Sequence, residues 1–201
     1  MSGLSTTPAC TGYPRDAPVD VAVTRDGAFA YVANGSNSVS AINLATRTVA
    51  ATIRLGDRPS AIAVAPDDSR VYAAASANRL FVITTATNGV SGEVGIAGSL
   101  AALGVAPNGA FVYVANPPNR VSVVDTAAAS VTRTIAVGTY PAGVAFTPDG
   151  ACAYVGSGGI LPDGGTISVI DAQTQMVTTT ITSPAGTPAS PASVAVANVR
   201  P

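Results

Sequence analysis

The sequence predicts an all-β fold, and its composition and its internal spacing carry that prediction. Apolar residues make up 47% of the 201-residue chain and charged residues 10%, which is too apolar for a disordered chain. Val, Ala and Ile dominate the apolar set, and Gly, Pro, Asn or Asp interrupt them every few positions. β-Branched runs between turn residues are typical of many short strands.

The spacing reveals a repeat of 41 residues. In the first copy, strand-like runs lie at 19–23, 30–33, 39–42 and 49–55, and an Asp-Gly pair suited to a tight hairpin separates the first two. Five columns stay in register along the chain: Tyr31, Tyr72, Tyr113 and Tyr154; Asp26, Asp67, Asn108 and Asp149; Val21, Ile62, Leu103 and Val144; Val23, Val64, Val105 and Phe146; and the small Ala22, Ala63, Gly104 and Ala145.

Four antiparallel strands in about 40 residues is the period of a β-propeller blade. We therefore predict an N-terminal arm at 1–17 and a β-propeller domain at 18–201. Its four four-stranded blades occupy about 18–58, 59–99, 100–140 and 141–190, and a fifth inner strand is left over at 193–196. A lone blade cannot bury both faces, so we expect stability to come from contacts between blades, with the tyrosines packed there.

Four blades and one strand do not close a ring by the usual exchange of strands. Small rings of four blades can close, but we favour a longer chain that supplies the missing blades, or self-association of two chains. Without such closure, the flanks of the first and fourth blades would be open and apolar.

Several segments carry a family resemblance: YVAN at 31–34 and 113–116, PDG at 148–150 and VID at 169–171. They resemble the YVTN-type β-propeller repeats of bacterial and archaeal surface proteins, over residues 18–196. The second and fourth copies depart from the motif, with YAAA at 72–75 and Gly156-Ser157. The resemblance implies more blades than this chain holds, an exported or surface location, and binding roles that are poorly defined.

The fourth copy is longer than the others, by five residues within 157–165 and four within 183–190. Insertions in repeat proteins gather on loops of one face, often the binding face. A tolerated surface insertion is the alternative.

The chain lacks the residues of common catalytic and metal sites. It has no His and a single Glu, Glu93, which excludes Ser-His-Asp triads and most zinc sites. The Asp residues mostly fall at predicted turns or strand ends, where turn chemistry explains them: Asp26, Asp67, Asp125, Asp149 and Asp171. We therefore assign no catalytic residue, no metal and no cofactor.

The expected partners and location follow from charge and hydropathy. The net charge is −1 and no basic block occurs, so we expect no nucleic-acid partner. No apolar run is long enough for insertion into a membrane. The N-terminus lacks the features of a signal peptide, so only the resemblance favours an extracellular or cell-surface location. Cys10 and Cys152 are either unpaired thiols or, in an exported chain, a disulfide.

One repeated pair is not explained by strand structure. Asn78-Arg79 and Asn119-Arg120 lie 41 residues apart, so adjacent blades would place both arginines on one loop rim. Arg58 and Tyr140 would project from the same rim. Two arginines held side by side could grip a carboxylate or a sulfate, although solvated rim charge is the alternative.

Taken together, these residues predict a non-catalytic binding or scaffold module that presents a loop rim to a protein, a glycan or a small anionic ligand. Two alternatives stay open. A propeller lactonase-like hydrolase would need carboxylates or His at the channel mouth, and a purely structural cell-surface unit would need no site.

Overall fold

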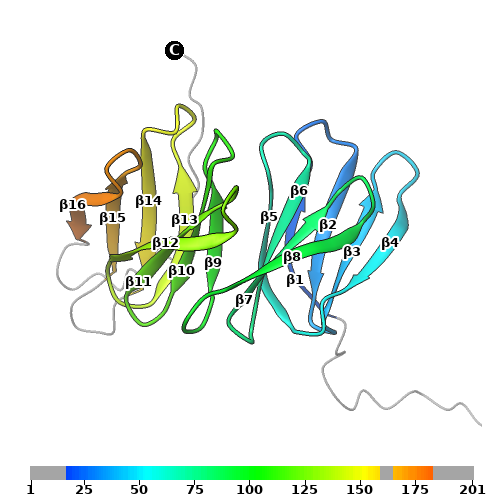
Figure 1. Cartoon of the computed structure of the whole chain (residues 1–201), viewed down its shortest axis with the longest axis horizontal. Helices are drawn as coiled ribbons and strands as arrows, with labels where there is room; N and C mark the ends of the chain where they lie inside the picture. Colours follow the sequence, from blue (N-terminus) through cyan, green and yellow to red (C-terminus); the bar gives the residue numbers. More distant parts are fainter. Residues whose placement is uncertain (1–16, 159–164, 183–201) are drawn as a thin grey trace, which may run out of the picture.

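The computed structural model describes residues 17–158 and 165–182, and every regular element in these ranges is a β-strand. Four consecutive strands form each of four antiparallel sheets (Figure 1). Blade 1 comprises β1 (Pro18–Val23), β2 (Phe29–Asn34), β3 (Ser38–Asn43) and β4 (Thr48–Arg54). Blade 2 comprises β5 (Pro59–Val64), β6 (Arg70–Ala75), β7 (Arg79–Thr84) and β8 (Gly89–Gly95). Blade 3 comprises β9 (Ala102–Val105), β10 (Phe111–Asn116), β11 (Arg120–Asp125) and β12 (Ser130–Ala136). Blade 4 comprises β13 (Pro141–Phe146), β14 (Cys152–Ser157), β15 (Thr166–Asp171) and β16 (Met176–Thr182).

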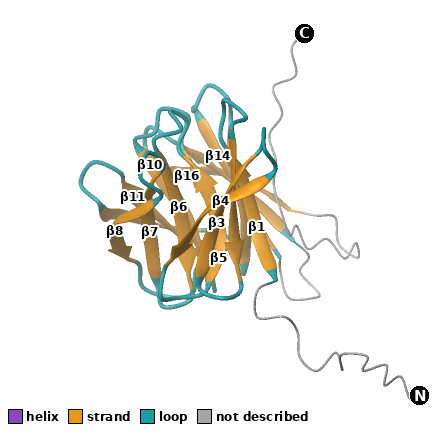
Figure 2. Ribbon diagram, turned by 90° about the vertical axis from the view of Figure 1, so that its right-hand side faces the viewer, coloured by secondary structure: helices purple, strands orange, loops and turns teal. Residues whose placement is uncertain are grey.

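The sheets stand side by side in chain order, as the blades of a propeller do. Their first strands pack against one another in sequence, β1 on β5, β5 on β9 and β9 on β13. The fourth strands lie at the periphery (Figure 1), and the loops gather at the two ends of the strands (Figure 2). The predicted all-β propeller architecture is therefore confirmed.

The turn between the first two strands of each blade needs a left-handed residue. Gly27, Gly109 and Gly150 take it at φ of 70°, 72° and 72°, a region that glycine enters without steric cost. In blade 2 the position is Asp68, at φ 59°. Its carboxylate accepts the Arg25 and Asp26 backbone N–H groups of blade 1, at 2.7 and 3.1 Å. The one departure from glycine thus carries a contact between blades.

Apolar side chains from facing blades form the core, in one cluster for each of the three seams. The first seam joins Tyr31, Val39 and Ile53 of blade 1 to Ile62 and Ile83 of blade 2. The other two seams repeat this arrangement with the equivalent residues of the next blades. The expectation that the tyrosines pack between blades is confirmed for Tyr31, Tyr72 and Tyr113, which are buried.

Polar contacts also cross each seam. Between blades 1 and 2, Asp20 accepts the Ile62 N–H at 2.8 Å. Between blades 2 and 3, the Ser60 hydroxyl donates to the Leu100 carbonyl at 2.7 Å. Between blades 3 and 4, the Arg133 guanidinium donates to the Thr174 carbonyl at 2.8 Å. Side chains that differ from blade to blade therefore reinforce one common packing pattern.

Some sequence expectations fall outside the described residues. These are the arm at 1–16, the leftover strand at 193–196, the four-residue insertion within 183–190 and most of the insertion within 157–165. Cys152 is a free, half-buried thiol, and Cys10 lies outside the described ranges.

Candidate functional site: the lower loop rim

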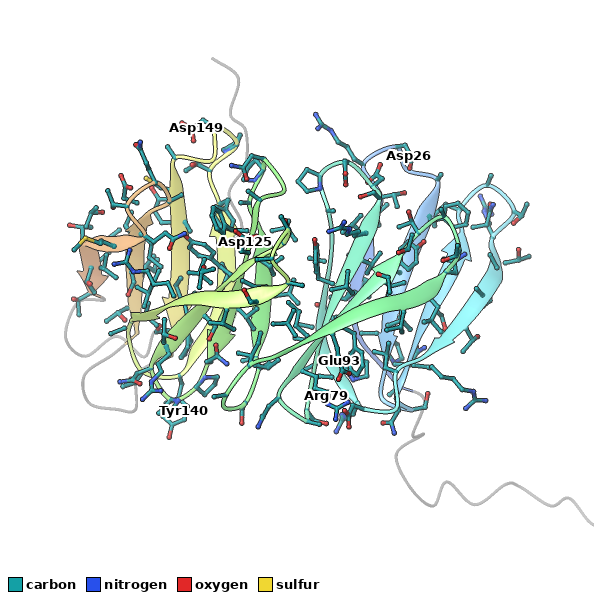
Figure 3. The ribbon with its side chains drawn as sticks, in the orientation of Figure 1. Asp26, Arg79, Glu93, Asp125, Tyr140 and Asp149 are labelled. Carbon is teal, nitrogen blue, oxygen red and sulfur yellow. The ribbon has the colours of Figure 1, made fainter. Side chains whose placement is uncertain are left out.

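The antiparallel topology divides the loops between two rims. The turns at 25–28, 66–69, 107–110 and 148–151, with those at 44–47, 85–88, 126–129 and 172–175, form what we call the upper rim. The loops at 35–37, 55–58, 76–78, 96–101, 117–119 and 137–140 form the lower rim. Figure 3 shows Asp26 and Asp149 at the top, and Arg79 and Tyr140 at the bottom.

The upper rim is rich in acidic residues that serve its own turns. As predicted from the sequence, each accepts hydrogen bonds from a neighbouring turn residue: Asp26, Asp67, Asp125, Asp149 and Asp171. Donation from the Ser69 hydroxyl and N–H holds the pKa of Asp67 below its ordinary value, and the Thr174 N–H and hydroxyl lower the pKa of Asp171. These carboxylates are committed to local structure.

The lower rim carries the opposite balance of charge. Its described charged residues are the arginines Arg54, Arg58, Arg79 and Arg120 and the acids Asp57 and Glu93. The described residues of the upper rim hold Arg25, Arg47, Arg70 and Arg133, whose guanidinium reaches the Thr174 carbonyl, against the five acids above and Asp68. Among the described residues, the lower rim is therefore the more cationic end of the propeller, which favours an anionic ligand there.

Arg79 is already paired with two acids, Glu93 of its own blade and Asp57 of the loop that precedes β5. Its guanidinium donates to Glu93 at 3.0 Å and lies 3.9 Å from the Asp57 carboxylate. Both partners are partly open to solvent, so each contact is worth at most about 1 kcal/mol. An incoming anion would have to compete with these two carboxylates for Arg79.

The other predicted rim residues are exposed, and backbone contacts fix their loops. The Arg58 carbonyl accepts the Ser76 N–H at 2.9 Å, which places Arg58 beside the turn that leads to Arg79. Tyr140 donates its N–H to the Pro118 carbonyl at 2.6 Å, beside the turn that leads to Arg120. Arg58 and Arg120 form no ion pair with any described residue. The four predicted residues thus form two groups on one rim, Arg58 with Arg79 and Tyr140 with Arg120.

The inner strands line an open hollow of about 380 Å³ along the propeller axis. Among the four described inner strands Asp20 is the one charged residue, and it is bonded to the Ile62 N–H. Within residues 17–158 and 165–182, no three His, Cys, Asp or Glu side chains are grouped to hold a metal ion. No helix of the described ranges has the length and apolar character needed to cross a bilayer.

A second hollow, of about 390 Å³, opens at the upper end of the seam between blades 3 and 4. Phe111, Tyr113 and Phe146 give it an aromatic wall, and the Tyr113 and Phe146 rings meet edge-on at 4.8 Å between centroids. The buried Tyr113 hydroxyl has no hydrogen-bond partner. Burial, followed by the nearby Asp171 charge, raises the pKa of Tyr113 to about 12, so this hydroxyl stays protonated at neutral pH.

Sequence reasoning missed the acids that engage Arg79. Asp57 directly precedes Arg58, and Glu93 lies on β8, opposite Phe81 of β7 in the strand register. Two sequence features could have indicated the contact between Glu93 and Arg79. Glu93 is the chain's single Glu, and it lies on the fourth strand of a blade, which pairs with the third strand that carries Arg79. The hollow between blades 3 and 4 could not be predicted from the sequence, because it depends on how closely the side chains around Tyr113 pack.

Radial four-stranded sheets around packed inner strands define the chain as a β-propeller protein. No family model and no curated protein matches its sequence. Among solved structures, the fold is similar to a chain of the Kuenenia stuttgartiensis hydrazine synthase, with a TM-score of 0.80 and 21% sequence identity. The match covers 90% of this chain and 53% of that chain, so the protein spans about half the length of the structure that it matches. At this identity the likeness establishes the fold.

Proposed function

We propose that the protein is a non-catalytic binding or scaffold module whose lower rim holds an acidic group of a partner. The observation that carries this proposal is the separation of charge between the rims. Arg58 and Arg120 are exposed on the lower rim without an ion pair among the described residues. The chemistry that suits them is a carboxylate or a sulfate, which an arginine can bind through two parallel hydrogen bonds.

Tyr140 supports the same rim as a contact surface. It is 48% exposed, although large aromatic residues are usually buried, and it stands beside the Arg120 turn. Tyrosine offers contact area at low entropic cost together with a polar tip, and it is enriched in binding interfaces. An aromatic side chain next to an arginine is suited to a sugar ring or to a protein side chain that carries an acid.

Titration calorimetry with two probes tests the proposal: a sulfated heparin hexasaccharide and a glutamate octapeptide. We expect binding of at least one probe at low salt, and the preferred probe separates a glycan partner from a protein partner. Since a hydrogen bond to a charged group contributes about 1.5–3 kcal/mol, the Arg58→Ala/Arg120→Ala variant should bind about tenfold more weakly or worse.

The matched control is Arg25→Ala/Arg47→Ala, which removes the same charge from the upper rim. It should leave probe binding close to that of the wild type. Glu93→Gln should strengthen binding, because it releases Arg79 from its 3.0 Å partner. If the two double variants lost the same amount of probe affinity, the effect would come from net charge alone, and a binding site on the lower rim would be contradicted.

The YVTN-type motif residues support a finer version of this proposal, in which the module belongs to a bacterial cell surface. Fractionation of the producing cell, with an antibody against the chain, tests that placement. The lactonase-like alternative gains no support from the described inner strands, where Asp20 is committed to the Ile62 N–H.

A further inference from the structure

Every seam in the molecule joins two different kinds of blade face. The tyrosine face of one blade holds Tyr31, Val39, Ala41 and Ile53, or their equivalents. The valine face of the next blade holds Ile62, Ala73 and Ile83, or their equivalents. The same pairing recurs between blades 2 and 3 and between blades 3 and 4. Three occurrences in one chain establish which surface covers which.

Within residues 17–158 and 165–182, the valine face of blade 1 has no such cover. Val21 is 57% exposed, whereas Ile62, at the same position of blade 2, is 5% exposed. Val19 and Val23 on the same strand are also exposed. Val32 is half-buried, while its equivalents are fully buried in the other blades: Ala73, Val114 and Val155. This face is thus an apolar surface of the kind that a tyrosine face covers elsewhere in the molecule.

The tyrosine face of blade 4 is equally bare. Ile181 is 51% exposed, whereas Ile53, its equivalent in blade 1, is 5% exposed. Tyr154 and Ile167 are half-buried, although their equivalents in blades 1 to 3 are buried: Tyr31, Tyr72, Tyr113, Val39, Leu80 and Val121. The described part of the chain therefore presents one uncovered face of each kind, at its opposite ends.

We propose that a second copy of this chain covers both faces. The tyrosine face of blade 4 in each copy packs on the valine face of blade 1 in the other, so a two-fold pairing creates two further seams and closes a ring of eight blades. Each new seam continues an interface that the chain already builds three times. A symmetric pair covers all four bare faces at once, and burial of such contiguous apolar surface is the usual driving force for assembly.

Size-exclusion chromatography with light scattering on the full 201-residue chain tests the proposal. The expected mass is twice the 19.7 kDa of one chain. Val21→Asp and Ile181→Asp place a charge in the two bare faces, and each should shift the protein to a single-copy mass while the strand signal in circular dichroism persists. If Val21→Asp fails to fold, Val21→Thr is the alternative test, because threonine has nearly the same shape as valine. It should raise the dimer dissociation constant about tenfold or more.

Val49→Asp is the matched control. Val49 is 59% exposed on β4, and its equivalents Val90 and Val131 stay exposed even where a neighbouring blade is present. This variant should weaken the dimer far less than Val21→Asp does, because Val90 and Val131 remain exposed inside a formed seam, although Val177 of blade 4 is partly buried against the third seam.

Three results would overturn the proposal. One is a single-copy mass for the wild type at concentrations of about 0.1 mM, far above the dissociation constants of stable dimers. Another is a dimer that survives Ile181→Asp but not Val21→Asp, since this pattern means back-to-back pairing of one face. The last is a mass that grows beyond two copies with concentration, which means an open chain of subunits instead of a closed ring.

Discussion

The Tyr31 hydroxyl of blade 1 donates a 2.9 Å hydrogen bond to the Asn88 side-chain oxygen of blade 2. Asn88 occupies the left-handed position of the turn between β7 and β8, and Ala129 and Gln175 hold the same position in blades 3 and 4. The repeated tyrosines therefore meet different partners. For Tyr72 of blade 2, the residue at this turn position of the next blade is Ala129. For Tyr113 of blade 3 it is Gln175 of blade 4, and the buried Tyr113 hydroxyl has no hydrogen-bond partner.

Removal of the tyrosine hydroxyls should separate these cases. Tyr31→Phe loses a hydrogen bond across the seam and should lower the free energy of unfolding by about 1 kcal/mol. Tyr113→Phe removes a buried hydroxyl that has no partner, so it should be neutral or stabilising. Urea denaturation of both variants measures the difference. Equal losses would mean that the hydroxyls matter for packing and not for the bond to Asn88.

Alkaline pH should destabilise the wild type through Tyr113. Because burial raises the pKa of this phenol to about 12, above its ordinary value of about 10, the unfolded chain loses the proton first as the pH rises. The contribution is fully present below pH 10 and is lost between pH 10 and 12, on the order of 1 kcal/mol. Between pH 9 and pH 11, the urea midpoint should fall further in the wild type than in Tyr113→Phe. A parallel fall in both proteins would assign the effect to other groups.

The repeat columns predicted the fold because each column has one structural task. The tyrosine at every forty-first position marks the second strand, and the residues around Val21 and Ile62 mark the face that meets the preceding blade. What the columns could not predict is where blade neighbours differ. The partner of Tyr31 depends on residue 88, and the cover on Val21 depends on a blade that the described chain does not supply.

The contacts of the rim arginines could be predicted only in part, for the same reason. The spacing of Arg79 and Arg120 placed both on one rim, and the structure adds that Arg79 is engaged by Glu93 and Asp57. Those contacts depend on the register between β7 and β8 and on the loop before β5. Neither leaves a periodic signal in the sequence.

The small column of the inner strands should not tolerate added volume. A Cβ on Gly104 of β9 would lie 3.1 Å from both the Val144 carbonyl oxygen and Cγ1 of blade 4. Because a backbone atom cannot yield as a flexible side chain can, Gly104→Ala should destabilise the protein by about 1–3 kcal/mol. Gly92→Ala on β8 is the control, since its Cβ would meet nothing within 4 Å. Thermal or urea unfolding that ranks the two variants the other way would contradict close packing of the inner strands.

Asp68 should contribute more than a turn residue does. Asp68→Asn keeps a side chain that tolerates the left-handed backbone, but it loses the charge that receives the Arg25 and Asp26 N–H groups of blade 1. Hydrogen bonds to a charged acceptor are worth about 1.5–3 kcal/mol, so we expect a loss of about 1–2 kcal/mol. Asp149→Asn is a control that affects a bond within one turn, to Ala151. Urea denaturation should show the smaller loss for this control, and equal losses would argue that Asp68 does not join the blades.

Ala129→Asn should build the Tyr31–Asn88 contact a second time, between Tyr72 and the turn of blade 3. Ala129 has a φ of 49°, a left-handed conformation that costs alanine about 1–2 kcal/mol and that asparagine tolerates better. The variant should therefore gain stability from the backbone and, if the amide reaches the Tyr72 hydroxyl, about 1 kcal/mol more from a hydrogen bond. A double-mutant cycle with Tyr72→Phe separates the two gains. If the gain in stability is the same with and without the Tyr72 hydroxyl, it comes from the turn alone. In that case, only Asn88 uses this turn position to bond the tyrosine of the preceding blade.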